Sequence, residues 1–288
     1  MNTHVKNQTL YAVCCLFIAM LCVQSSGALA KILFQDFSVP MVSAMRLLIG
    51  GTLLALIFKV WTIQWQQVRW RVILFYGLSI AGMNLLFYSA LQRIPLGIAV
   101  AFEFLGPLLV ALAHARKRID VLWVMLVMLG LSLVLPITQH TKSLDPLGVL
   151  FALGAGACWA LYIVVGQRPT GLSGNHTVCL GMLIGMLCVL PILVFSPQLS
   201  AAFQPDALIM FSVLAVLASA LPFSLEMFAL RNLSTLSFGT LMSLEPAAAT
   251  LSGLLFLNEQ LTWIQGIALV CIMLASIGCT LTSNTQQS

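Results

Sequence analysis

The chain has 288 residues, of which 60% are hydrophobic and only 7% are charged, and its mean hydropathy is +1.04. A soluble domain carries about 25% charged residues, so this composition excludes a water-soluble protein and predicts apolar side chains that face lipid. The net charge of +5 is scattered, with no basic stripe interleaved with aromatic residues, which argues against nucleic-acid binding.

Apolar stretches long enough to cross a bilayer, about 20 residues each in a helix, follow one another along the whole chain. In order, they are residues 10–33, 38–58, 71–92, 94–114, 121–137, 146–167, 176–196, 207–229, 235–257 and 261–283. The connections between them are short. Since backbone groups in lipid have to be hydrogen-bonded within the membrane, the sequence predicts an all-α membrane protein with ten transmembrane helices.

Positive charges are unequally shared between the two sets of loops. With the N-terminus placed in the cytoplasm, the inside segments hold Lys6, Lys59, Arg69, Arg71, Arg116, Lys117, Arg118, Arg168 and Arg231, whereas the outside loops hold Lys31, Arg93 and Lys142. Cytoplasmic loops of membrane proteins carry the excess of Lys and Arg. The distribution therefore predicts that both termini are cytoplasmic in a multi-pass inner-membrane protein.

The chain also matches itself at a shift of 139 residues, which aligns Gly27 with Gly166 and Pro107 with Pro246. This match predicts two units, residues 10–137 and 146–283. Five helices in each unit is an odd number, so the second unit is inserted upside down relative to the first. Inverted repeats of this kind are typical of secondary transporters, which bind cargo near the midplane, and they argue for a transporter over a membrane enzyme.

Ionisable residues deep in a membrane are costly and are functional candidates by default. Arg46, Glu103 and Glu245 fall within predicted helices, and Glu226 lies nearer the inner end of its helix. An acid could bind a substrate ammonium or carry a coupling proton, and Arg46 could hold a substrate carboxylate. The alternative is structural: a buried ion pair with Arg46 would hold the bundle together, and Glu226 could neutralise Arg231.

Each of the two deep acids stands beside a proline. Pro107 is one helical turn after Glu103 and removes the hydrogen bond to the carbonyl of that residue, whereas Pro246 directly follows Glu245. Helix breaks at matched positions of two repeats are a pointer to a transport site. We therefore interpret Pro107 and Pro246 as helix breaks at such a site.

Several polar and aromatic side chains could line a central cavity, although each could equally be a packing residue: Gln24, Asn84, Tyr88, Trp159 and Tyr162. Asn84 and Tyr88 share a helix face by their spacing, as do Trp159 and Tyr162. The cysteines lie in apolar runs without a C-x-x-C pair, and no H-E-x-x-H zinc pair or Ser/His constellation occurs. We therefore predict no metal, no cofactor and no enzymatic activity.

Three runs resemble the EamA repeats of the drug/metabolite transporter superfamily: residues 75–112, 152–168 and 221–262. Within them, PLGIAVAFEFLGPL and SLEMFALRNLSTLSFGTLMSLEP are similar to the bacterial amino-acid exporter branch. The resemblance implies ten helices in two inverted repeats around a central cavity. It also implies efflux of threonine, homoserine and related small amino acids that is driven by the proton gradient. Only Glu103, Glu226 and Glu245 carry over as site residues.

Together these features predict an alternating-access antiporter that exchanges a small amino acid for protons across a lipid bilayer. The alternative is a transporter of the same superfamily for another cargo, such as a toxic cation, a purine or an aromatic metabolite. A passive channel is a weaker alternative, because no filter-like segment or charged ring is visible. No oligomeric state is predicted.

Overall fold

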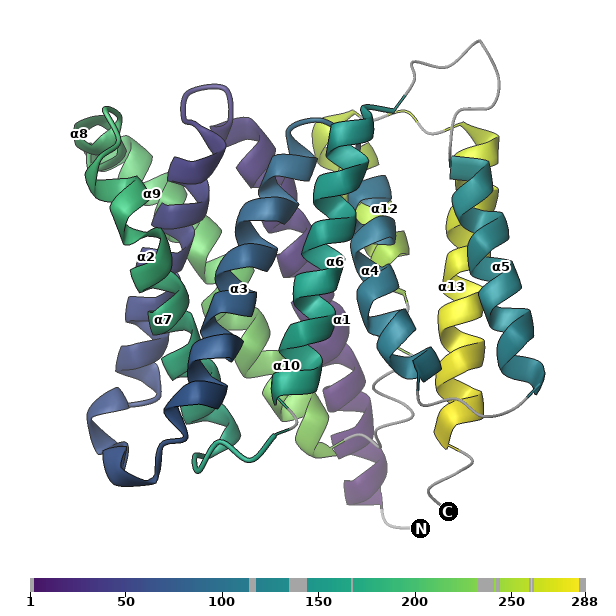
Figure 1. The fold of residues 1–288 in the computed structure, drawn as a ribbon, viewed down its shortest axis with the longest axis horizontal. Helices are drawn as coiled ribbons and strands as arrows, with labels where there is room; N and C mark the ends of the chain where they lie inside the picture. The colour runs from purple at the N-terminus through teal and green to yellow at the C-terminus, as the bar shows by residue number, and fades with distance from the viewer. Residues whose placement is uncertain are drawn as a thin grey trace.

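The computed structural model describes residues 3–113, 118–134, 144–166, 168–232, 241, 244–258, 260 and 262–284. All regular structure in these residues is helical, and none of them lies in a β-strand (Figure 1). The all-α prediction is therefore confirmed for the described part of the chain.

The helices of the first half are α1 (Thr3–Leu33), α2 (Val39–Ile57), α3 (Trp70–Leu91), α4 (Leu96–Ala113) and α5 (Arg118–Val134), with single turns η1 (Val60–Thr62) and η2 (Trp65–Gln67) between α2 and α3. The second half contains α6 (Pro146–Gly166), α7 (Gly174–Val194), the short α8 (Leu199–Ala202), α9 (Pro205–Ala215), a π-helical turn η3 (Val216–Ala220), α10 (Leu221–Asn232), α12 (Glu245–Leu257) and α13 (Trp263–Asn284). Each predicted span contains helical residues, but most of residues 233–243 lie outside the description.

Within the described ranges, five helices are long and apolar enough to cross a membrane: Leu10–Leu33, Val39–Ile57, Trp70–Leu91, Pro146–Gly166 and Gly174–Val194. The remaining apolar helices are shorter, at Leu96–Val110, Pro205–Ala220, Ala248–Leu257 and Trp263–Ala275. These helices support a multi-pass membrane protein. The count of ten crossings stays a prediction.

The outer surface of the bundle is apolar. Large hydrophobic side chains such as Phe75, Leu150 and Leu255 are exposed on it, which is the arrangement expected of a surface in contact with lipid tails. The exposed rings of Trp65 and Trp70 stack in parallel, with centroids 6.1 Å apart, where α3 begins. Tryptophan is enriched at membrane–water interfaces, so this pair is placed where a helix would leave the bilayer.

The two halves of the chain interleave. Among the described helices, the most extensive packing joins α3 to α6, α5 to α13, α4 to α6, α2 to α7 and α1 to α10. Every one of these pairs takes one helix from each half. Exchanging the halves maps α3 with α6 onto α10 with α1, and leaves α2 with α7 and α5 with α13 in place. This is the pattern that a two-fold relation between the repeats would produce.

Helix directions fit the same relation. In Figure 1, α1 and α6 run in opposite directions, as do α2 and α7. The start of α1 and the end of α13 lie at the same end of the bundle. These directions support the predicted inverted repeat, whose orientation in a membrane stays a prediction.

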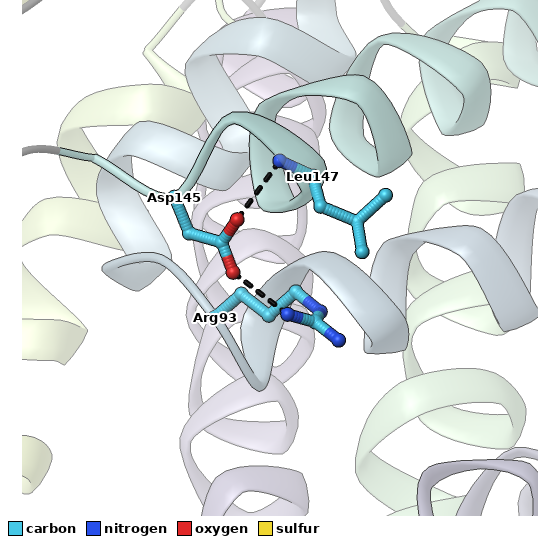
Figure 2. A network of polar contacts seen from close by, with 3 residues as sticks. All are labelled: Arg93, Asp145 and Leu147. Carbon is cyan, nitrogen blue, oxygen red and sulfur yellow. Dashed lines mark hydrogen bonds and ion pairs between the residues drawn. The ribbon is translucent and has the colours of Figure 1, made fainter.

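The start of α6 is capped by the side chain that precedes it in the sequence. Asp145 precedes α6, and its carboxylate Oδ1 accepts a hydrogen bond of 2.9 Å from the backbone N–H of Leu147, as an N-cap residue does. Its other oxygen, Oδ2, accepts a 2.7 Å bond from Nη1 of Arg93, which lies between α3 and α4 (Figure 2). This ion pair therefore ties a connection in the first half to the first helix of the second half.

The helices α4 and α6 approach closely because glycines face each other at the crossing. A Cβ atom on Gly156 would lie 2.6 Å from the carbonyl oxygen of Glu103, and one on Gly106 would overlap the carbonyl oxygen of Gly156. Small residues at such positions let two backbones touch. The crossing fixes the stretch of α4 that carries Glu103.

Candidate functional site

Arg46 is the centre of a polar cluster that three helical segments build. It lies in the middle of α2 and is half-buried. Its Nη1 donates a 2.8 Å hydrogen bond to Oδ1 of Asn84 and a 3.3 Å bond to the hydroxyl of Tyr88. The guanidinium carbon also lies 5.3 Å from the centre of the Tyr88 ring, within the range of a cation–π contact.

The third partner of Arg46 is a backbone carbonyl. Nη2 donates a 3.1 Å hydrogen bond to the oxygen of Ala218 in η3. Pro222 has no N–H, so it cannot make the bond to Ala218 that a regular α-helix would contain at this point. The chain forms a π-helical turn here instead, and such turns are frequent at functional sites.

Two buried carboxylates lie close to this cluster. Glu103 on α4 is 8% exposed and Glu245 at the start of α12 is 7% exposed. Glu103 is near enough to Glu245 and Arg46 to interact electrostatically with both. Oε1 of Glu245 accepts a 3.2 Å hydrogen bond from Nε2 of the buried Gln24, which joins α1 to α12.

The prolines beside the two acids occupy different positions in their helices. Pro107 lies inside α4, which continues through it, whereas Pro246 lies in the first turn of α12. Only the latter marks the start of a described helix, at which Glu245 is the first residue. Met242, whose carbonyl Pro246 was expected to leave free, lies outside the described residues.

Arg46 and Glu103 interact electrostatically without forming an ion pair in the described structure. In the part of the chain that the structure describes, the Arg46 guanidinium makes no ion pair with Glu103, and its hydrogen bonds go to uncharged groups. The printed hydrogen bonds of Arg46 therefore leave its positive charge without a carboxylate partner among them.

The aromatic pair predicted on α6 contacts other aromatic rings. Trp159 contacts the ring of Phe104 edge-on at 5.7 Å, and Tyr162 stacks on Tyr76 at 4.5 Å. These rings pack α6 against α4 and α3, and Trp159 stands next to the residue that follows Glu103. The side chain of Glu226 lies outside the description, although its backbone belongs to α10.

Sequence reasoning missed the carbonyl of Ala218, although the signal was present. Pro222 follows Ala218 by four residues in a helical stretch, as Pro107 follows Glu103. The missing N–H of Pro222 leaves the carbonyl of Ala218 without its helical hydrogen bond, as that of Pro107 does for Glu103. Among the described residues, no group of three or more His, Cys, Asp or Glu side chains could hold a metal ion.

An apolar helical bundle with a half-buried arginine and two buried acids is the arrangement expected of a multi-pass membrane transporter. The chain belongs to the EamA-like transporter family, whose model matches residues 10–138 and 146–281. Two copies of the repeat thus account for nearly the whole chain.

Named relatives in this family are similar along most of their length. The threonine/homoserine exporter RhtA of Salmonella typhimurium strain SL1344 is 48% identical over 273 residues, which cover 93% of this chain and 90% of the relative. The protein of the same name from Escherichia coli K12 is 47% identical with the same coverage. Protein PecM of Dickeya dadantii is 25% identical over 264 residues, with 89% of this chain and 88% of the relative covered.

A solved crystal structure shares the fold. It is 20% identical, with a TM-score of 0.58, and the match covers 96% of this chain and 99% of the other. At this identity the likeness concerns the fold alone.

Proposed function

We propose that this protein exports threonine, homoserine and related small amino acids across the bacterial inner membrane in exchange for protons. The observation that carries the proposal is the position of Arg46, held by uncharged groups beside the buried acids Glu103 and Glu245. The chemistry of the site matches an amino acid in its zwitterionic form. The names of the relatives support the choice of threonine and homoserine.

In this proposal, ten helices cross the membrane and both termini are cytoplasmic. Substrate enters from the cytoplasm, and its carboxylate binds the planar fork of Arg46, which suits two oxygens at once. Its ammonium binds a deprotonated Glu103 or Glu245. A proton arriving from the outside neutralises the acid, so the ammonium loses its partner and the substrate leaves outward.

The first test is export from a threonine-overproducing bacterium that lacks its own exporters, with and without this protein. External threonine and homoserine are followed over time, and a protonophore is added midway. We expect faster efflux with the protein and slower efflux after the protonophore. No protein-dependent efflux at confirmed membrane expression would remove the amino-acid assignment and direct the search to toxic cations, purines and aromatic metabolites.

A second test addresses the proton. Glu245→Gln keeps the size of the side chain and its ability to bond Gln24, but it removes the charge, so we expect export to fall to background. The matched control is Asp206→Asn, which removes an exposed acid in the first turn of α9 and should export normally. Normal export by Glu245→Gln at equal expression would exclude Glu245 as the coupling group.

A further inference from the structure

The charge of Arg46 lies where it is costly, and its hydrogen bonds do not compensate it. A guanidinium within a transmembrane helix costs several kcal/mol unless a partner compensates it, and buried arginines are usually paired with acids. Glu103 is near enough to interact electrostatically with it, yet the hydrogen bonds of Arg46 in the described structure go to an amide, a phenol and a backbone carbonyl. Its Nε is buried and has no hydrogen-bond partner among the described residues.

We propose that Asn84 is a positioning residue that, together with Tyr88 and the carbonyl of Ala218, holds Arg46 in place without neutralising it. The proposal rests on the proposed function, because the charge that these groups leave uncompensated is the one that binds the substrate carboxylate. An aspartate at position 84 would have nearly the same shape and would capture the guanidinium as an ion pair. The amide supplies the same acceptor oxygen, 2.8 Å from Nη1, and no charge.

The three acceptors come from elements that restrict one another. Asn84 and Tyr88 lie one turn apart on α3, and both are buried. Ala218 belongs to η3 in the second half of the chain and is also buried. Arg46 is therefore clamped between the two repeats. A movement of η3 relative to α2 and α3 would change the direction in which its fork points.

Pro222 has a specific part in this arrangement. Since it cannot donate to the Ala218 carbonyl, that oxygen remains an acceptor for Arg46. An alanine at position 222 would restore the N–H of a regular helix and draw the carbonyl back into the helix. The change should stabilise the helix locally, because alanine is a far better helix former than proline. A functional loss in this variant would not come from unfolding.

The test compares Asn84→Asp, Asn84→Ala and Pro222→Ala with wild type in inside-out vesicles, where export appears as uptake of labelled threonine. Initial rates give KM and Vmax, and 1-amino-2-propanol, which is threonine without its carboxylate, serves as a competitor. Pro205→Ala is the matched control for Pro222→Ala, because Pro205 is exposed at the start of α9 and leaves no helix carbonyl without its bond. Melting temperatures in detergent report folding.

We expect Asn84→Asp to raise the KM for threonine at least about tenfold, with a melting temperature no lower than that of wild type, because the new ion pair competes with the substrate. Asn84→Ala and Pro222→Ala should raise KM by about threefold and reduce the preference for threonine over 1-amino-2-propanol. Pro205→Ala should change neither quantity.

A wild-type KM in Asn84→Asp would overturn the proposal, since a purely structural asparagine tolerates that ion pair. If Asn84→Asp does not fold, the other two variants decide: an unchanged preference for threonine over its decarboxylated analogue overturns it. Wild-type vesicles that take up neither threonine nor homoserine would instead refute the proposed function, and this inference with it.

Discussion

Arg46 and Arg93 are bound in opposite ways within one chain. Arg93 lies in a connection with its side chain 39% exposed, and it pairs with the carboxylate of Asp145 at 2.7 Å. Arg46 lies within α2, where charge compensation matters most, and its hydrogen bonds go to uncharged groups. Stability alone would favour the reverse, because exposed ion pairs contribute little and buried charges are costly. The difference supports the proposal that Arg46 binds the substrate carboxylate.

The largest expected effect comes from removing the positive charge of Arg46 within α2. Arg46→Gln should reduce threonine export to background, because Asn84, Tyr88 and the Ala218 carbonyl, which hold Arg46, carry no positive charge for a carboxylate. Arg46→Lys should recover little, since an ammonium cannot replace a planar fork at a site with several partners. Initial export rates at matched membrane expression check both variants. Equal rates for Arg46→Lys and wild type would show that only a positive charge is needed there.

The same substitution at the exposed Arg93 tests whether the loss at Arg46 depends on its position. Arg93→Gln removes a guanidinium of the same size, yet we expect export within about twofold of wild type, because an exposed ion pair contributes little. If Arg93→Gln and Arg46→Gln impair export equally, the contrast between the two arginines has no functional meaning.

A smaller effect is expected at the partner that contacts Arg46 least tightly. Tyr88→Phe removes the hydroxyl at 3.3 Å but keeps the ring beneath the guanidinium. A typical hydrogen bond contributes about 0.5–1.5 kcal/mol net, and this one is longer than the bond to Asn84, so the KM should rise by no more than the increase of about threefold expected of Asn84→Ala. Tyr88→Leu, which removes the ring as well, should raise it further. A larger loss in Tyr88→Phe than in Tyr88→Leu would exclude the cation–π contact.

The smallest effect concerns Asp145. The hydrogen bond from Arg93, and after it the backbone N–H of Leu147, hold the pKa of Asp145 below its usual range. A depressed pKa stabilises the fold above the ordinary aspartate value, and that contribution is lost as the pH falls through the lowered value. Asp145→Asn keeps a good N-cap and loses only the ion pair. Its melting temperature should be slightly below wild type at neutral pH, and the two should converge in strong acid. A difference that persists there would have another cause.

Much of the fold could be predicted because it depends on local composition. Apolar runs located the helices, and the spacing of Asn84 and Tyr88 placed both on one face of α3, where both contact Arg46. The pairing of Gln24 with Glu245 could not be predicted, since the two are 221 residues apart. The partners of Arg46 could not be predicted from local patterns either. The sequence suggested an ion pair between Arg46 and a buried acid such as Glu103 as one possibility. Trp159 and Tyr162 share a face as expected, but contacts with other helices decide that Trp159 meets Phe104 edge-on and Tyr162 stacks on Tyr76.

The interleaving of the repeats bears on how the protein is made. Because α1 packs on α10, and α5 on α13, the first half of the chain has few partners until the second has been synthesised. Until then Arg46 lacks the carbonyl of Ala218, and Glu103 lacks the cover of α6. A chain divided between α5 and α6 should therefore yield halves that are degraded when expressed singly. Expressed together, they should assemble, since each holds the surfaces that the other requires.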